Sequence, residues 1–532
     1  MLRLTDIKLP LDHAPAALKA AILKKLKLPA DSLLDFQVFK RAHDARNKQA
    51  IAYIYTVDVT LKDEARPPKE ARPTPDMDYK FAAHAPAAFP NDQLKRPLVI
   101  GAGPCGLFAT LILAQSGFRP ILLERGKAVR ERTKDTWGLW RRSVLNPESN
   151  VQFGEGGAGT FSDGKLYSQI KDPRYLGRKV LHEFVRAGAP EEILTEAHPH
   201  IGTFRLVTMV EAMRETIETL GGEYRFQSKV TDLLLTPEHG VRGVRLESGE
   251  EIESGHVVLA LGHSARDTFE MLHERGVAIE AKPFSIGFRI EHPQGLIDKA
   301  RFGRSIPQLG AADYKLVHHA KNGRDVYSFC MCPGGTVVAA ASEPGRVVTN
   351  GMSQYSRNER NANAGIVVGI TPEVDYPGHP LAGIALQRRW EEAAFAAGGG
   401  TYAAPAQLVG DFIAGQPSTA LGEVAPSYRP GVTPTDLSTC LPDYAVDAIR
   451  EALPAFGRQI KGFDRADAVL TGVETRTSSP IRIQRGEDFQ SLNTPGLYPA
   501  GEGAGFAGGI LSAAVDGIKV AEAVAKSIVG KS

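Results

Sequence analysis

The first part of the chain shows two different periods of hydrophobic and polar positions. Apolar residues recur every three or four positions over 14–26, which predicts a helix. Over 50–61 they alternate with polar residues, which predicts a half-buried strand. Shorter strands are predicted over 3–9 and 34–40. Residues 1–62 are therefore expected to form a small α/β module.

Prolines interrupt the pattern directly after this module. The stretch 63–94 contains Pro67, Pro68, Pro73, Pro75, Pro86 and Pro90. Because proline lacks a backbone N–H and fixes φ, such a stretch cannot hold a long helix or a central strand. We expect it to be a linker.

A strand pattern over 97–100 leads directly into three glycines, Gly101, Gly103 and Gly106, and then into a helical pattern. In this order the first glycine allows a tight turn, the second lets backbone amides approach a pyrophosphate, and the third lets helix and strand pack closely. The helix N-terminus would face the phosphates. The next strand ends at Glu124, whose carboxylate can accept hydrogen bonds from ribose hydroxyls. The pattern predicts a dinucleotide at this turn.

Two further glycine-rich segments extend the predicted site. One has five glycines in the eleven residues of 154–164. Ordering so flexible a loop is costly, and a ligand held by backbone amides is the usual compensation. The other, over 501–509, precedes a helix predicted over 510–529, and a positive helix end there would stabilise an anionic reduced flavin. We interpret the first glycine turn and the last segment as two halves of one FAD site.

The order of the remaining patterns sets the expected fold class and domain division. A strand near Val230, a hairpin after it and a buried strand ending at Gly262 are the order expected of a doubly wound domain. From 284 onwards the texture changes to strands and loops. We predict an α/β protein with a doubly wound, Rossmann-like FAD-binding domain and an inserted α+β substrate domain. The expected boundaries are 1–62 for the N-terminal module, 63–94 for the linker, 95–283 and 481–532 for the FAD-binding domain, and 284–480 for the insertion.

Composition narrows the class of partner. With 532 residues the chain needs more than one core, and a net charge of +2 argues against binding to nucleic acid or an anionic membrane surface. The four cysteines do not form a disulfide framework or a zinc-ligand spacing, so no metal is expected. No signal peptide or membrane span is apparent. We expect a soluble cytoplasmic protein that acts on a small molecule.

Several long motifs together resemble one known family. They lie at 101–106, 151–166, 199–203, 261–268, 329–335, 475–480 and 499–505. These motifs are similar to those of the largely uncharacterised bacterial FAD-dependent dehydrogenases, which belong to the glutathione-reductase-type flavoproteins. The resemblance covers almost the whole chain and implies an FAD-binding fold with an inserted domain and an N-terminal module. One departure is Phe204, where the family pattern implies an acidic residue.

The motifs name the residues expected to bind the cofactor. They are Gly101, Gly103, Pro104, Cys105, Gly106, Glu124, Arg125, Gly156, Gly157, Thr160, Ser162, Gly164, Lys165, Val230, Gly262, Gly501, Glu502, Gly508, Gly509 and Ile510.

Three residues are candidates for catalysis. Lys165 could place a cation beside the flavin, or be a solvated lysine after a turn. His263 could act as an acid or base near pH 7, or be a loop histidine with a structural partner. Arg476, with Arg482, could bind a substrate carboxylate, or both arginines could be structural.

Cys330 and Cys332 are two apart on a predicted strand. In a regular strand their Cα atoms would be roughly 6.5–7 Å apart on one face, at the outer limit for a disulfide. We therefore expect the two side chains to pack or to line the substrate chamber, with a redox dithiol as the alternative.

These patterns favour an oxidoreductase that transfers hydride between an organic substrate and noncovalently bound FAD. No second strand–glycine–helix unit is found, so electrons are expected from the substrate, from transiently bound NAD(P)H or from a redox partner protein. Two alternatives remain. One is a flavin monooxygenase, although Asp163-Gly164 lies in a glycine loop and matches its signature poorly. The other is an RNA- or protein-binding module in which the flavin is structural.

Overall fold

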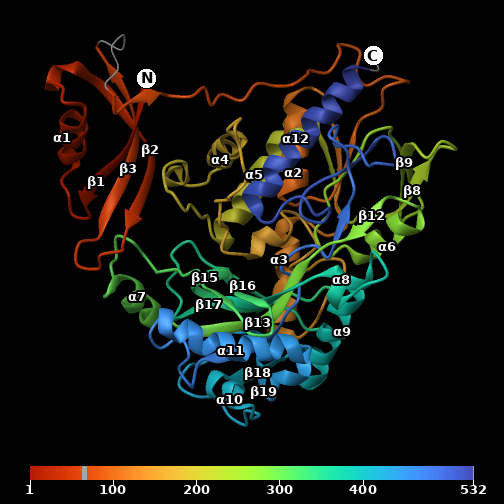
Figure 1. Cartoon of the computed structure of the whole chain (residues 1–532). Helices are drawn as coiled ribbons and strands as arrows, with labels where there is room; N and C mark the ends of the chain where they lie inside the picture. Colours follow the sequence, from red (N-terminus) through yellow and green to blue (C-terminus); the bar gives the residue numbers. More distant parts are fainter. Residues whose placement is uncertain (63–68, 531–532) are drawn as a thin grey trace.

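The computed structural model describes residues 1–62 and 69–530 of the chain (Figure 1). The first part of the predicted linker, with Pro67 and Pro68, lies outside the described residues. From 69 to 94 the linker contains only the two-residue strand β4 (Arg72–Pro73). No helix in the described ranges has both the length and the apolar composition to cross a bilayer.

The N-terminal residues form a four-stranded antiparallel sheet with one helix on one face. The sheet order is β2-β3-β1-β4, with β1 (Leu2–Pro10), β2 (Leu33–Asp44), β3 (Ala52–Leu61) and β4. Helix α1 (Pro15–Leu26) packs Leu18, Ile22 and Leu26 onto the sheet, the spacing that predicted the helix. The short turn η1 (Ala30–Ser32) follows. Strand β2 is longer than expected because it continues to the turn before β3.

A five-stranded parallel sheet forms the centre of the molecule, and it confirms the predicted fold class. Its order is β22-β11-β5-β6-β7, with β5 (Leu98–Ile100), β6 (Ile121–Leu123), β7 (Glu223–Arg225), β11 (Val257–Leu259) and β22 (Leu497–Pro499). The first strand in sequence, β5, is in the middle of the sheet, so the chain winds outwards in both directions.

Alternating side chains bury both faces of this sheet. Val99, Val258 and Tyr498 face a core shared with α2 (Pro104–Gln115), α5 (Thr203–Thr219) and α12 (Ile510–Val529). Leu98, Ile100 and Leu259 face the opposite core, which contains β8 (Val230–Leu235), β9 (Val241–Leu246), β10 (Glu251–Glu253) and α6 (Arg266–Glu274). The remaining elements of this part are α3 (Val129–Arg142), η2 (Ala158–Phe161), α4 (Leu176–Arg186) and η3 (Glu191–Leu194).

A second, larger sheet lies below the first in Figure 1. Its order is β14-β15-β17-β13-β20-β18-β19, with β16 paired to β15. The strands are β13 (Phe284–Pro293), β14 (Val317–His319), β15 (Asp325–Ala339), β16 (Thr349–Ser353), β17 (Asn361–Ile370), β18 (Ala404–Leu408), β19 (Val432–Pro434) and β20 (Val469–Glu474). The helices are α7 (Gln294–Phe302), α8 (Pro372–Asp375), α9 (Ala382–Ala397), α10 (Val409–Ala414), η4 (Leu437–Cys440) and α11 (Asp443–Gln459).

Two antiparallel strands join the two sheets. β12 (Ile279–Ala281) carries the chain towards the larger sheet, and β21 (Ile481–Ile483) carries it back. They pair with each other, Ile279 opposite Ile483 and Ala281 opposite Ile481. The chain therefore leaves the first part of the molecule and returns to it at neighbouring positions.

Strand β15 differs from expectation. Cys330 and Cys332 were expected on a regular strand, but the strand that contains them has shifts of register between Phe329 and Cys332 and between Cys332 and Gly335. Local pattern cannot show such a bulge, because it depends on pairing with the distant β17.

Candidate functional site

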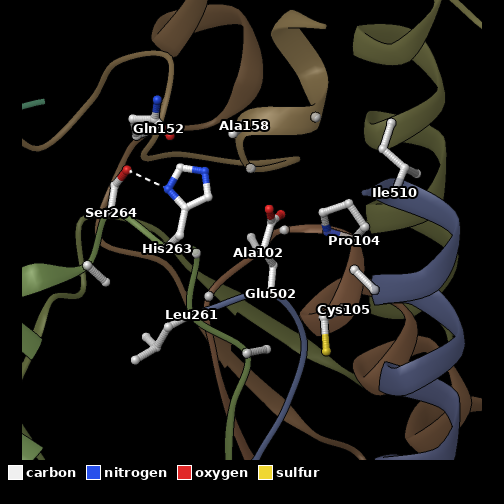
Figure 2. A pocket seen from close by; sticks show the side chains of 18 of the residues that line it. Ala102, Pro104, Cys105, Gln152, Ala158, Leu261, His263, Ser264, Glu502 and Ile510 are labelled. Carbon is white, nitrogen blue, oxygen red and sulfur yellow. Dashed lines mark hydrogen bonds between the residues drawn. The ribbon is translucent and has the colours of Figure 1, made fainter. Parts of the chain in front are cut away.

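A cavity of about 400 Å³ lies at the carboxyl ends of the parallel strands (Figure 2). Residues directly after β5, β6, β11 and β22 line it: Ala102, Glu124, Leu261 and Glu502 are examples. The first turns of α2 and α12 line it as well, through Pro104 and Ile510. This edge of a doubly wound sheet is where such folds bind their ligands.

Most residues predicted to bind the cofactor line this one cavity. They are Gly101, Gly103, Pro104, Cys105, Glu124, Arg125, Gly157, Ser162, Gly164, Lys165, Val230, Gly262, Glu502, Gly508, Gly509 and Ile510. The fold thus brings both halves of the predicted site together.

Four of the predicted residues do not line the cavity. They lie within its wall and hold the lining segments in place. A Cβ on Gly106 would lie 1.8 Å from the carbonyl oxygen of Gly101, so this glycine is needed for helix–strand packing. Gly156 donates its N–H to the Ala102 carbonyl at 2.8 Å. Thr160 is buried, and Gly501 donates its N–H to Asp516 at 2.8 Å. The prediction of direct cofactor contact is corrected for these four.

Glu124 organises the turn around the predicted pyrophosphate position. Its buried carboxylate accepts hydrogen bonds from the backbone N–H groups of Ala102 and Gly126, each at 2.8 Å, and of Gly154 at 2.9 Å. One side chain therefore fixes three segments of the cavity wall. The predicted ribose contact would use the lone pairs that these amides leave.

Arg125 lines the cavity, but its charge is already compensated. The guanidinium pairs with Glu148 at 2.7 Å and Asp267 at 2.8 Å, and it lies 4.1 Å from the centre of the Phe153 ring. The two carboxylates raise the pKa of Arg125, although burial opposes them. What it offers a cofactor is a fixed planar surface rather than a free cation.

Sequence reasoning missed Arg132, which holds the glycine-rich loop in place. This fully buried side chain of α3 donates to the carbonyls of Asn150, Val151 and Glu155, each at 2.7 Å, and of Gly157 at 2.9 Å. The bonds order a loop that its glycines leave flexible. A single arginine on a polar helix gave no signal of this role.

Glu502 points into the cavity (Figure 2). Burial raises the pKa of its carboxyl to about 7, against the smaller opposing effects of Lys282 and the Gly509 backbone. Near neutral pH this group can hold or release a proton.

His263 also points into the cavity, with its Nδ1 3.1 Å from the Ser264 hydroxyl (Figure 2). Burial lowers the pKa of this imidazole to about 3, and the positive charges of Arg476 and Arg266 act in the same direction. Of the two roles predicted for His263, this lowered pKa favours the structural one over an acid or base near pH 7. The ring is neutral and can donate or accept one hydrogen bond.

Arg476 lines the cavity, but it has no free fork for a substrate carboxylate. It binds Glu391 through Nε at 3.0 Å and Nη2 at 2.9 Å, and it donates through Nη1 to Ser264 and Ser342. Of the two roles predicted for Arg476, these contacts favour the structural one. The other candidate, Arg482, is on β21 and lies 3.9 Å from Glu280.

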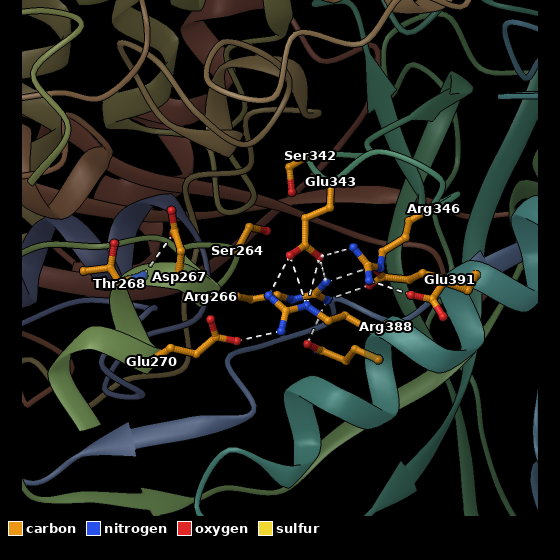
Figure 3. A network of polar contacts seen from close by, with 12 residues as sticks. Ser264, Arg266, Asp267, Thr268, Glu270, Ser342, Glu343, Arg346, Arg388 and Glu391 are labelled. Carbon is orange, nitrogen blue, oxygen red and sulfur yellow. Dashed lines mark hydrogen bonds and ion pairs between the residues drawn. The ribbon is translucent and has the colours of Figure 1, made fainter. Parts of the chain in front are cut away.

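Through Glu391, Arg476 joins a buried network of charges between the two sheets, and Figure 3 shows other members of it, among them Arg266, Glu343 and Arg388. Glu391 of α9 also accepts from Arg266 of α6, at 2.7 and 2.9 Å. Glu343 accepts from Arg388 and from Arg266. Residues from both sides of the β12–β21 connection therefore meet in one cluster beside the cavity wall.

Lys165 brings a positive charge to the opposite wall. Its ammonium donates to the Met331 carbonyl and lies 4.0 Å from Asp163, which in turn pairs with Arg357. Burial lowers the pKa of Lys165, but the neighbouring thiols and Asp163 outweigh it, so the net shift is upward. The ammonium stays protonated at neutral pH.

The inserted sheet contributes wall residues, of which sequence reasoning had singled out Cys330 and Arg476. They are Phe329, Asn350 and Thr477, with Cys330 and Arg476. They come from strands and loops far apart in sequence, and only the pairing of β13, β15, β16, β17 and β20 brings them together. The same holds for Gln152 and Lys229 on the side of the parallel sheet.

The residues present fit FAD. Two helix N-termini face one cavity, neither first turn carries an acidic residue, and the first-turn amides have no acceptor within their helix. A Cβ on Gly157 would lie 2.8 Å from the Cα of Gly103, so the two glycine segments approach each other as closely as backbone allows. The inserted sheet closes the far side of the cavity.

Comparison with known proteins agrees with this fit. Residues 283–477 match a family model described as FAD-dependent protein, C-terminal domain-like, and residues 1–60 match a domain of unknown function, DUF8436. An uncharacterized protein of Clostridium beijerinckii is 48% identical over 529 residues, 98% of each chain. The cofactor of this chain is FAD.

Solved structures match less closely. The flavin-dependent brominase Bmp2 has a TM-score of 0.35 at 14% identity, covering 82% of this chain and 79% of its own. Glycine oxidase from Geobacillus kaustophilus gives 0.34 at 13%, covering 81% and 94%. L-Proline dehydrogenase from P. horikoshii gives 0.35 at 14%, covering 82% and 94%. Scores this low do not bear on the reaction of this chain.

Proposed function

This chain belongs to the same family as the Clostridium beijerinckii protein, and we propose that it is an FAD-dependent dehydrogenase or reductase of a small organic molecule. The observation that carries the proposal is the composition of the cavity wall. One side comes from the glycine segments that fit FAD, and the other from the inserted sheet. Bound FAD would supply a two-electron acceptor, and the wall residues of the inserted sheet would face a substrate bound beside it.

The charged and polar residues of the wall would divide the work. Lys165 provides a fixed positive charge that stabilises negative charge developing on a substrate. Neutral His263 orients a substrate by one hydrogen bond, because its ring carries no second proton at neutral pH. Glu502, with a pKa of about 7, would hold or release the proton that accompanies a hydride transfer.

The electrons would come from outside the chain. Within residues 1–62 and 69–530 there is one parallel sheet of the dinucleotide-binding kind. The donor or acceptor would therefore be the substrate itself, transiently bound NAD(P)H or a redox partner protein. The four free cysteines fit a protein that works in the cytoplasm.

An anaerobic screen tests the proposal. The purified yellow protein is mixed with candidate small molecules and with NADH and NADPH, and the flavin absorbance is followed. We expect at least one donor to bleach it. Failure of every donor, with a flavin that dithionite reduces but air does not reoxidise, would indicate a structural cofactor. In a parallel aerobic reaction, a product hydroxylated at the expense of oxygen would indicate a monooxygenase instead.

A lysine pair gives the matched variants. We expect Lys165→Met to slow reduction by the donor about tenfold or more, because the stabilising charge is lost. Lys171→Met changes an exposed lysine after the same loop and should leave the rate unchanged. Equal rates in both variants would remove Lys165 from the mechanism.

A further inference from the structure

Cys330 and Cys332 contact each other at the wall of the cavity. The thiol of Cys332 donates to the carbonyl oxygen of Cys330, with the Sγ 3.4 Å from that oxygen. Cys330 is partly exposed and lines the cavity, whereas Cys332 is buried behind it. The pair therefore has one accessible thiol and one protected thiol.

The backbone is what brings the two thiols together. Cys330 has a φ of +44°, in the left-handed region that non-glycine residues rarely occupy. The register of β15 against β17 shifts on both sides of Cys332. In a regular strand the side chains would stand parallel, roughly 6.5–7 Å apart. Backbone strain of this kind is concentrated at functional sites.

Two cations hold the bulge in this conformation. Arg289 donates to the carbonyl of Cys330 at 2.8 Å, and Lys165 donates to the carbonyl of Met331. Arg289 is fully buried and its own charge is balanced by Glu474 at 3.0 Å. The bonds place two positive charges next to the accessible sulfur.

The electrostatic balance favours ionisation of the accessible thiol. The hydrogen bond from Cys332 lowers the pKa of Cys330 most, and Lys165 and Arg289 lower it further against the cost of burial. The same pairing raises the pKa of Cys332. The carboxylates with an electrostatic effect on this pair oppose ionisation, and they are Asp163, Glu474 and Glu502.

We propose that Cys330 and Cys332 are a redox-active dithiol that exchanges with the disulfide of a small molecule. The Cys330 thiolate attacks one sulfur of that disulfide, so its S–S bond breaks, a mixed disulfide forms and one thiolate leaves. Cys332 then gives its proton to the released thiolate and attacks the Sγ of Cys330. A Cys330–Cys332 bond forms and the second thiolate leaves, to be protonated by water. The pair loses two electrons, and the small disulfide gains them as two thiols.

This activity uses only residues of the chain, so it can be tested without the hydride transfer proposed above. Cys330 and Cys332 are on one tryptic peptide, residues 325–346, because no lysine or arginine lies between Arg324 and Arg346. Oxidation of the pair therefore lowers the mass of that peptide by two hydrogens while leaving it intact. Apoprotein and holoprotein are each incubated with glutathione disulfide, quenched in acid, alkylated and digested.

We expect the oxidised peptide in wild type, and its loss again when dithiothreitol is added. The Cys330→Ser and Cys332→Ser variants should not form it. A stable mixed disulfide with glutathione should accumulate in Cys332→Ser only, because Cys330 is then the attacking thiol without a partner. The control Cys440→Ser changes a buried cysteine of η4 and should behave as wild type.

A second measurement does not depend on variants that fold. At pH about 6.5 an ordinary thiol with a pKa of about 8.5 is only about one per cent ionised. We expect iodoacetamide to label Cys330 in native wild type at least about tenfold faster than in the unfolded chain. A peptide 325–346 that stays reduced, or a Cys330 that is labelled no faster than in the unfolded chain, would overturn the proposal.

Discussion

At the scale of single residues, the shape of the cavity depends on side chains that hydrogen-bond to the backbone of its wall. Glu124 is the main case, since its carboxylate accepts from three amides that belong to three segments. Arg132 does the converse for carbonyls of the glycine loop. Both side chains are buried, so without them the backbone groups that they bind would be unsatisfied polar groups.

We predict that Glu124→Ala destabilises the apoprotein as well as weakening FAD binding. Three backbone N–H groups lose their acceptor, and each costs about 1–3 kcal/mol where water cannot replace it. Thermal unfolding of the apoprotein and titration with FAD measure the two effects. Glu124→Gln keeps an acceptor oxygen and should lose less of both. An Ala variant with unchanged apoprotein stability would show that the carboxylate acts on the cofactor alone.

Gly103→Val should abolish FAD binding while the fold survives. A Cβ at this position meets only the Cα of Gly157, at 3.8 Å, so the first atom fits, but the branched methyls would occupy the cavity. Absorbance of the purified protein and its far-UV circular dichroism are the readouts. Gly369→Val is the control, because a Cβ there meets nothing within 4 Å. Stoichiometric FAD in the Gly103 variant would refute the site assignment.

Glu502 predicts a pH effect on the apoprotein. Its pKa is raised to about 7 in the folded state, above that of an ordinary glutamate, so the folded state binds the extra proton. This stabilising contribution is complete below the unfolded pKa of about 4.3 and is lost as pH rises through about 7.

We therefore expect Glu502→Gln to stabilise the apoprotein at pH 8 relative to wild type, by about 1–3 kcal/mol after allowance for partial exposure. The two proteins should differ little at pH 4.5. Denaturant unfolding at both pH values checks the sign. A variant less stable than wild type at pH 8 would contradict the raised pKa.

At the scale of elements, the buried charge network joins α6 to α9 and to the residues after β20. Glu391 compensates two arginines at once, Arg266 and Arg476. These two arginines hold the pKa of the Glu391 carboxyl far below its usual range against the cost of burial. Such buried clusters add little stability compared with apolar packing of the same volume. Removing one partner alone is strongly destabilising, because it leaves a buried charge unpaired.

Two neighbouring glutamates test this point. Glu391→Gln should lower the free energy of unfolding by about 3–5 kcal/mol, because two buried cations lose their counter-charge. Glu392→Gln removes a partly exposed partner of Arg346 alone and should cost about 1 kcal/mol or less. Chemical denaturation with the holoprotein compares them. Equal losses would mean that the network is not stabilising the contact between α6 and α9.

At the scale of the whole molecule, the sequence predicts best the parts whose order along the chain mirrors their order in space. The turn at Gly101–Gly106 and the helix over 510–529 follow strands directly, so local pattern identifies them and the fold rule places them together. In the inserted sheet, strands far apart in sequence are neighbours, so local pattern does not place its residues. Cys330 was expected on a regular strand, and its true conformation depends on pairing with β17 and on bonds from Lys165 and Arg289.

The same reason explains why the sequence alone left two roles open for each of two residues at the cavity. His263 and Arg476 are each plausible in isolation as an acid or a carboxylate binder. Their roles depend on contacts from other elements. Glu391, Ser264 and Ser342 occupy the donors of Arg476, and burial, with the charge of Arg476 acting in the same direction, lowers the pKa of His263. No window of sequence contains both partners of these contacts.

The pairing of β12 with β21 has a consequence for how such a protein can diversify. The chain enters and leaves the insertion through two adjacent strands. The part that contains the glycine segments therefore ends at the same two-stranded ribbon, whatever residues lie between 282 and 480. During evolution this insertion could be exchanged or enlarged without disturbing the turn at Gly101 or the helix that starts at Ile510. The wall that the inserted sheet contributes to the cavity can thus change in evolution, while the glycine segments that fit FAD are kept.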